Sequence, residues 1–206
     1  MIIAAAAPID TCGNALAANE IHAGCTRRLV SPDGRWQVVI KGEGEPAPAV
    51  NISRQLKDDN AVVADHAGHV IAVFDMERDA RLYWLKDGRH LIVNYFAGSD
   101  STRPLAFNLN AGHSAPVDLS ALVFSDVLRR IHKRRRQVYH YYMWYLRDEG
   151  DYVTFAAEPE FTIHGDYGPG DGRCLIYRVD KATFRGYRFV REAPDDKCPQ
   201  TPSDGP

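Results

Sequence analysis

Two pairs of side chains have the types and spacing that catalytic or metal chemistry needs, and the first is His66 with His69. These histidines stand three residues apart beside Asp65, and two imidazoles at that spacing can ligate a metal ion. Gly68 disfavours a helix between them, and the sequence places no third ligand nearby. We therefore interpret the segment as a surface loop, and we predict no metal site and no cofactor.

The second pair is Glu158 and Glu160. Because side chains alternate along a strand, these carboxylates would share one face about 7 Å apart, and paired carboxylates can hydrolyse glycosidic bonds. Pro159 between them cannot donate a ladder hydrogen bond and favours an exposed edge strand, so a solvated edge is the simpler interpretation. No Gly-x-Ser-x-Gly motif marks a serine nucleophile. We predict no catalytic residue; a hydrolase that uses either pair is the enzymatic alternative.

A basic run followed by aromatic residues is the first feature that could bind a partner. Its members are Arg129, Arg130, Lys133, Arg134, Arg135 and Arg136, and then Tyr139, Tyr141, Tyr142, Trp144 and Tyr145. This combination is typical of nucleic-acid binding, but the formal net charge of −2 and the lack of a known motif argue against it. The run would complement a helix C-terminus, and it could also dock an acidic protein or a glycan.

The loop from His164 to Gly172 is the second such feature, with four glycines and two aspartates. Its spacing does not fit a calcium loop. A flexible hairpin tip is the simplest interpretation, and a tip that enters a partner's cleft is the functional one. The predicted partner-binding residues combine both features: Asp166, Tyr167, Asp171, Arg130, Arg134, Arg135 and Trp144.

A repeated phrase indicates the elements that carry these residues. The turns Asp33-Gly34, Asp87-Gly88, Glu149-Gly150 and Asp171-Gly172 each precede a run rich in β-branched or aromatic residues. Glycine tolerates the positive φ of a tight turn, so each phrase predicts a β-hairpin. Strands are expected at 27–40 (two strands), 49–56, 69–75, 81–85, 90–96, 105–109, 138–146, 152–163, 174–180 and 187–190. One amphipathic helix is expected at about 118–135, with Asp118 or Ser120 as its cap.

One phrase, Ser31-Pro32-Asp33-Gly34-Arg35-Trp36, resembles the Ser-Pro-Asp-Gly repeat of TolB-type β-propellers from the bacterial periplasm. The segment from Trp84 to Val93 is similar to the same repeat. The resemblance implies a periplasmic, β-propeller-like scaffold, and the motif carries no catalytic residue. Three or four units are too few for a closed propeller, and the helix interrupts them. The expected fold is therefore mainly β, with antiparallel hairpins arranged as a partial propeller or a twisted open sheet.

The four cysteines lie near the two ends of the chain as local pairs. An even number so placed favours the disulfides Cys12–Cys25 and Cys174–Cys198; four unpaired thiols in a cytosolic protein are the alternative. The stretch that begins Met1-Ile2-Ile3-Ala4 resembles the end of a signal peptide, and no stretch reaches a membrane-spanning length. We expect a periplasmic or secreted bacterial protein.

The expected organisation is an N-terminal arm at 1–26, one β-rich domain at 27–192 and a flexible tail at 193–206. A small exported β protein without a convincing catalytic motif favours a binding module. The leading hypothesis is a non-catalytic module that binds another protein, with an immunity-type inhibitor of an envelope-targeted toxin enzyme as one concrete form. The alternative is a glycan- or solute-binding half-propeller that uses Trp84, Tyr142 and Trp144 as stacking platforms. Neither nucleic acid nor membrane is an expected partner, and the sequence does not define the oligomeric state.

Overall fold

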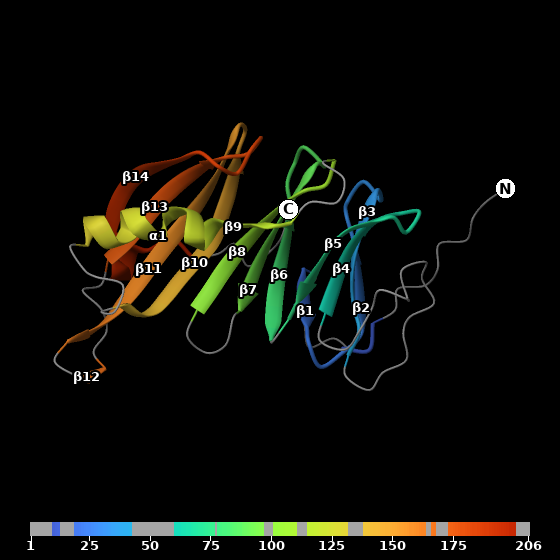
Figure 1. The fold of residues 1–206 in the computed structure, drawn as a ribbon, viewed down its shortest axis with the longest axis horizontal. Helices are drawn as coiled ribbons and strands as arrows, with labels where there is room; N and C mark the ends of the chain where they lie inside the picture. Colours follow the sequence, from blue (N-terminus) through green and yellow to red (C-terminus); the bar gives the residue numbers. More distant parts are fainter. Residues whose placement is uncertain are drawn as a thin grey trace.

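A computed structural model of the chain describes residues 10–12, 19–42, 60–76, 78–96, 101–110, 115–131, 138–163, 166–167 and 173–200. These residues form two β-sheets and one α-helix (Figure 1). The mainly β class and the open sheet built from antiparallel hairpins are confirmed.

The smaller sheet is an antiparallel meander of four consecutive strands (Figure 1, blue to teal). They are β2 (Arg27–Val30), β3 (Trp36–Ile40), β4 (Asn60–Asp65) and β5 (Val70–Asp75). The valine-rich strands β3 and β4 are almost wholly buried, as β-branched side chains favour. The sequence did not predict β4, and the strand predicted at 49–56 lies outside the described residues.

The larger sheet has ten strands, eight of them in the order β1-β6-β7-β8-β10-β11-β13-β14. Their bounds are Glu20–His22 (β1), Asp79–Trp84 (β6), His90–Phe96 (β7), Ser101–Asn108 (β8), Val138–Glu149 (β10), Tyr152–Ile163 (β11), Arg173–Asp180 (β13) and Tyr187–Pro194 (β14). Two short strands, β9 (Val117–Asp118) and β12 (Asp166–Tyr167), pair with β8 and β11. The hairpins predicted from the second and third phrases are therefore confirmed as β6–β7 and β10–β11.

The only parallel junction among the described strands joins β8 to β10. It consists of the pairs Tyr141–Ser101 and Tyr142–Thr102. Further along, Asn94 of β7 accepts a hydrogen bond from the Tyr145 N–H at 3.1 Å through its side-chain oxygen. The buried Asn94 side chain of β7 thus bonds the β10 backbone beyond the two residue pairs that join β8 to β10.

Three of the four glycine turns adopt the backbone conformation that the phrase requires. Gly34, Gly88 and Gly150 have φ of 72°, 61° and 71°, a region that side chains with a Cβ rarely enter. They close the β2–β3, β6–β7 and β10–β11 hairpins. The fourth turn, Asp171-Gly172, lies outside the described residues.

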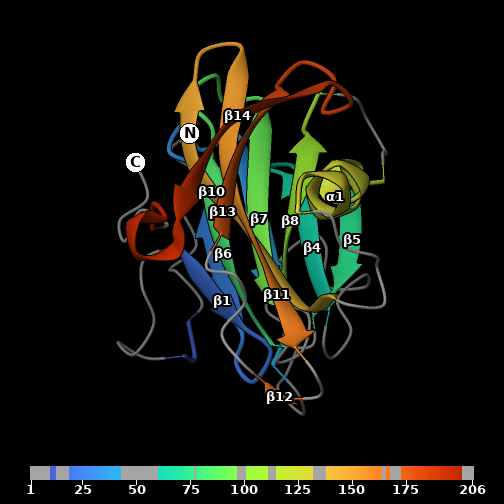
Figure 2. The same ribbon diagram turned by 90° about the vertical axis from the view of Figure 1, so that its left-hand side faces the viewer.

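Helix α1 (Leu119–Arg130) covers one face of the larger sheet (Figures 1 and 2). Asp118 caps its N-terminus by accepting a hydrogen bond from the Ala121 N–H at 3.0 Å. Its buried residues include Leu119, Val123 and Val127, which lie four residues apart and so share one face of the helix. The predicted helix is confirmed, and its expected extension over 132–135 lies outside the described residues.

Strands β6, β7 and β8 bury both faces. Leu82, Leu91 and Val93 point to the core shared with the smaller sheet. Tyr83 and Ile92, at alternate positions, point to the core under α1. The large sheet is thus an internal layer at this point.

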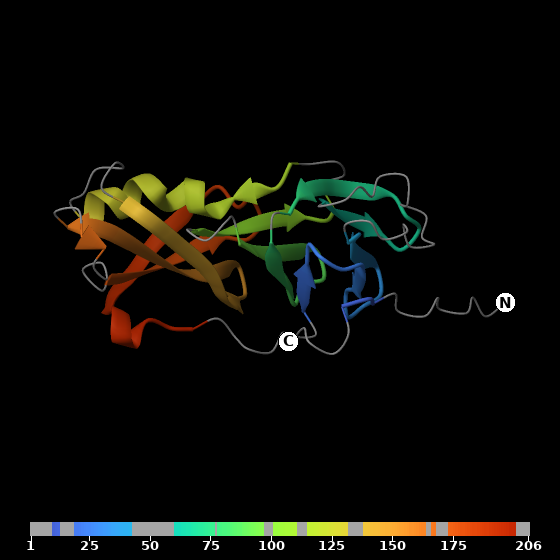
Figure 3. The same cartoon turned by 90° about the horizontal axis from the view of Figure 1, so that it is seen from below.

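Both predicted disulfides are present, Cys12–Cys25 and Cys174–Cys198. Two disulfides are typical of proteins that fold in an oxidising compartment, which supports export. Cys198 follows η3 (Asp195–Lys197), which lies on the face of the sheet opposite α1 (Figure 3). The residues predicted as an N-terminal arm include β1, and the boundary predicted after residue 192 falls within β14.

Candidate functional site

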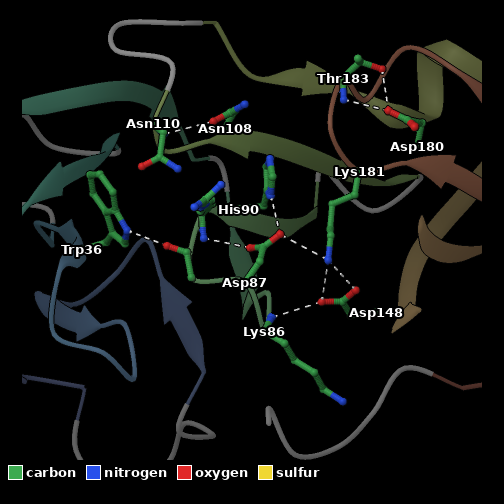
Figure 4. Close-up of polar contacts among 12 residues, drawn as sticks. Trp36, Lys86, Asp87, His90, Asn108, Asn110, Asp148, Asp180, Lys181 and Thr183 are labelled. Atoms are coloured by element: carbon green, nitrogen blue, oxygen red, sulfur yellow. Dashed lines mark hydrogen bonds and ion pairs between the residues drawn. The ribbon is translucent and has the colours of Figure 1, made fainter. Parts of the chain in front are cut away.

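A buried ion network joins the ends of three hairpins (Figure 4). Lys181, in the turn between β13 and β14, lies 3.0 Å and 3.3 Å from the two carboxylate oxygens of Asp148. Its Nζ also lies 3.3 Å from Asp87 Oδ2 in the β6–β7 turn. The side chains of Lys181 and Asp148 are only 12% and 5% exposed, whereas Asp87 is 26% exposed.

The network shifts the pKa values of Asp87 and Lys181 toward their charged forms. Burial alone would raise the pKa of Asp87, but the Arg89 N–H, His90 and Lys181 together lower it. Burial alone would lower the pKa of Lys181, but hydrogen bonds and charges from Asp148 and Asp87 raise it. Attraction therefore outweighs desolvation at these two groups, and both are ionised at neutral pH.

His90 completes the network at β7. Its Nδ1 lies 2.8 Å from Asp87 Oδ2, and its ring meets the edge of Phe184 at a centroid distance of 5.2 Å. An Asp–His pair is a component of general-base machinery. However, His90 Nε2 is buried and has no hydrogen-bond partner among the described residues. The Asp87–His90 contact ties the β6–β7 turn to the start of β7.

A pocket of about 500 Å³ opens beside the network. Its lining residues are Asp87, Arg89, His90, Asp151, Tyr152, Asp180, Lys181 and Ala182. Tyr152 is 40% exposed and presents an aromatic ring among charged groups. The sequence predicted the turns that carry these residues but not that their ends meet.

The repeated phrases also contact one another between the two sheets. Arg35 Nη2 and Trp36 Nε1, which follow the first Asp-Gly turn, donate to the Gly88 carbonyl oxygen at 2.9 Å and 3.0 Å. Gly88 belongs to the second such turn (Figure 4 shows the Trp36 bond). Each phrase therefore has a structural role beyond its own hairpin.

A second network stabilises the outer face of β10, β11 and β13. Glu149 accepts hydrogen bonds from Arg178 Nε at 2.6 Å, Thr154 Oγ1 at 2.7 Å and Arg147 Nε at 2.6 Å. The Arg178 hydrogen bond is the largest cause that lowers the pKa of Glu149, to about 2. The carboxylate is thus fully committed to three neighbours.

Arg130, a predicted partner-binding residue, is used inside the protein. Its Nε lies 2.6 Å from Asp126 Oδ2, and its guanidinium lies 3.6 Å from the centroid of the Phe189 ring. Asp126 is buried and also bonds Arg129 and the Tyr177 hydroxyl. Arg134 and Arg135 lie outside the described residues.

The aromatic residues proposed as stacking platforms do not gather in one place. Trp144 packs beside the Cys174–Cys198 disulfide, and its Nε1 donates to the Pro199 carbonyl at 3.0 Å. Trp84 packs against the core shared with the smaller sheet. The Tyr142 ring meets His140 edge-on at 5.8 Å.

The structure separates the other predicted candidates. The backbone of Asp166 and Tyr167 pairs with β11, and Asp171 lies outside the described residues. His69 is 82% exposed and bonds Asp65 at 2.7 Å. The described residues contain no group of three acidic, histidine or cysteine side chains placed to hold a metal ion.

The Glu158–Glu160 pair lies on a stretch of β11 that pairs with β10 on one side. The ladder with β13 ends at Ala157, just before Pro159. Glu160 Oε2 lies 2.7 Å from His140 Nδ1. The locally open side explains how β11 accommodates a proline.

Strand β14 is an exposed edge that the sequence did not single out. Among the described residues it pairs only with β13, and six of its eight residues are exposed. Tyr187 and Val190 are each 40% exposed. The signal in the sequence was the alternation of Tyr187, Arg188, Phe189 and Val190, which predicted a strand but not its position at an edge.

No protein-family model matches this chain, and no curated protein matches it. Across the described ranges, the helical segments fall short of the length and apolarity that crossing a bilayer requires.

Proposed function

We propose that this chain is an exported, non-catalytic module that binds another protein. The observation that carries the proposal is β14, an exposed strand that ends the larger sheet. An open strand edge presents unpaired N–H and C=O groups, and a partner can pair with them by adding a strand.

The support beneath β14 suits a binding edge. Its neighbour β13 is largely buried, and the Cys174–Cys198 disulfide fixes the chain just beyond the end of β14. A rigid edge loses little conformational freedom on association, which favours affinity.

The ionisable groups with catalytic potential further support a binding role. Asp87, Asp148 and Lys181 hold hairpin ends together, and Glu149 holds three neighbours on the outer face. Such groups stabilise a scaffold, and the exposed features that remain are suited to recognition.

One concrete form of this function is a periplasmic, immunity-type inhibitor that neutralises a toxin enzyme delivered to the envelope. The two disulfides suit that compartment, and a rigid strand edge could occlude an enzyme's active site.

The test is capture of a partner by the full chain, with both disulfides intact, from a bacterial periplasmic extract. We expect saturable binding of one protein, and loss of that protein's enzymatic activity when the complex forms. A reduced and alkylated sample is the control for folding. The absence of any specific partner at micromolar concentration would sink the proposal.

The pocket beside Tyr152 favours a second candidate, binding of a sugar or another polar solute. Sugars stack on exposed aromatic rings and bond to charged side chains, and both are present here. Thermal shifts against simple sugars and peptidoglycan fragments would test it. Tyr152→Ala should abolish a shift that Tyr187→Ala, an equally exposed tyrosine outside the pocket, retains.

A further inference from the structure

We infer that β14 recognises an extended segment of its partner in which acidic side chains alternate with apolar ones. This inference rests on the proposed function and names the chemistry of the partner. It is carried by the arrangement of charged and apolar side chains on the two faces of β14.

A β-bulge places two arginines of β14 on the same face. Arg188 pairs with Arg178 of β13 and Arg191 pairs with Ile176, and these two β13 positions share a face because they are two residues apart. The register shifts between Ile176 and Tyr177, so Val190 is the extra residue. Without the bulge, Arg188 and Arg191 would point to opposite faces.

These arginines present positive charge that no described carboxylate neutralises, although the Arg188 guanidinium lies 5.9 Å from the centroid of the Tyr152 ring. Arg188 and Arg191 are exposed, and neither has an ion-pair partner among the described residues. Arg178 on the same face is different, because it is paired with Glu149 at 2.6 Å. Arg185, exposed just before β14, adds a third charge. Because the whole chain has a net charge of −2, this basic stripe is local.

The opposite face of β14 carries the aromatic residues Tyr187 and Phe189, followed by the exposed Glu192. The rings of Tyr187 and Phe189 both contact Tyr177, at centroid distances of 6.0 Å and 5.8 Å. A strand added beside β14 would present alternate side chains to the two faces. Carboxylates on one face would meet Arg188 and Arg191, and apolar side chains on the other would meet Tyr187, which is 40% exposed.

Charge also disfavours one way in which a second copy of the chain could pair with β14. In an antiparallel pair of β14 strands centred on Arg188, that residue faces its own copy. Arg185 and Arg191, three residues to either side, then face each other. Like charges directly opposite across a strand pair are destabilising. A partner with acidic side chains removes this repulsion.

The experiment selects random 12-residue peptides, displayed on phage, against the full chain with its disulfides intact. We expect enrichment of sequences in which Asp or Glu alternates with apolar residues. A synthetic peptide from the selection should slow amide hydrogen exchange within residues 187–194. Its affinity should fall about tenfold in Arg188→Glu/Arg191→Glu, because two favourable ion pairs become repulsive.

The matched control is Arg78→Glu/Arg103→Glu, which changes the net charge equally at two exposed arginines outside β14 and outside the pocket. It should bind the peptide within about twofold of the original chain, since screening weakens distant surface charges. Circular dichroism would establish that both double variants are folded.

Three results would overturn the inference: selection without an acidic bias, equal weakening in both double variants, or protection outside β14. Failure to select any peptide, or a dimer that Arg188→Glu/Arg191→Glu strengthens, would also overturn it. The capture experiment separates this failure from failure of the proposed function. If the original chain and Arg188→Glu/Arg191→Glu captured a partner equally, the proposed binding function would be supported. The inference that β14 recognises acidic side chains would be contradicted.

Discussion

Replacement of Lys181 by methionine tests whether the buried ion network holds the three hairpin ends together. The substitution keeps a long, flexible side chain but removes the ammonium group that lies 3.0 Å from Asp148 and 3.3 Å from Asp87. Two carboxylates would then face each other with less compensation. The free-energy cost is larger for the Asp148 carboxylate, because its side chain is only 5% exposed and water cannot solvate the charge.

The magnitude follows from the burial of the pair. Removal of one member of a buried ion pair costs about 3–5 kcal/mol, because the other charge is left without compensation. We take the lower end, about 3 kcal/mol, since the Lys86 N–H still donates to Asp148 at 3.2 Å. In a chain of 206 residues, that loss corresponds to a fall in Tm of about 6–12 °C.

The assay is thermal and urea unfolding followed by circular dichroism, with both disulfides intact. Lys86→Met is the matched control, because the Lys86 side chain is exposed and only its backbone N–H bonds Asp148. We expect that control to change Tm by less than about 2 °C, as surface substitutions usually do. The double variant Lys181→Met/Asp148→Asn should cost less than the sum of the single variants, because the uncompensated charge is gone.

Two results would refute this reasoning. One is a fall in Tm for Lys181→Met no larger than that for Lys86→Met. The other is strict additivity of the two substitutions at 181 and 148, which would mean that these side chains are not energetically coupled.

Three further predictions concern other parts of the scaffold. Cys174→Ser/Cys198→Ser opens a loop with a sequence separation of 24 and should cost about 3–4 kcal/mol. A red shift of tryptophan fluorescence should accompany it, since Trp144 packs beside that disulfide; an unchanged urea midpoint would contradict it. Glu149 has a folded-state pKa of about 2, below its ordinary value, so its stabilisation is present above about pH 4.5. This stabilisation should be lost as the pH falls toward 2. Glu149→Gln should therefore reduce the change in the free energy of unfolding over that pH range by about 1–2 kcal/mol, as followed by Tm. Gly88→Ala should destabilise more than Gly34→Ala in urea titrations. Both residues have positive φ, but a Cβ at residue 88 would lie 2.4 Å from Arg35 Nη2, whereas residue 34 has open space; equal losses would exclude the crowding.

The sequence predicted those parts of the fold that depend on local chemistry. Gly34, Gly88 and Gly150 mark hairpins because their turns need a positive φ. Helix α1 was predictable because its buried residues recur at helical spacing. The disulfide pairs followed from the positions of the cysteines along the chain.

The remaining features depend on which distant segments meet, and no local pattern encodes that. Lys181 and Asp148 are 33 residues apart, and neither neighbourhood indicates the other. The sequence predicted that Arg130 binds a partner, but its guanidinium pairs with the buried Asp126 carboxylate and lies over the Phe189 ring. The sequence predicted a strand at β14 but not its position at the edge, because that position depends on the order of strands in the sheet. The likeness of the Ser31–Trp36 phrase to TolB-type repeats stays a prediction.

The position of β1 next to β6 has a consequence for the order in which the chain can fold. The smaller sheet lies between these two strands in the sequence, but His22 and Asp79 face each other across the pair, and the Ala23 N–H donates to Arg78 O at 3.3 Å. The meander β2–β5 can therefore form early from contacts that are close along the chain, whereas β1 has no strand to pair with until residues 79–84 have been synthesised. Pairing of β1 with β6 closes a long loop and completes the core shared by the two sheets. We therefore expect β1 to be among the last strands to pair during folding.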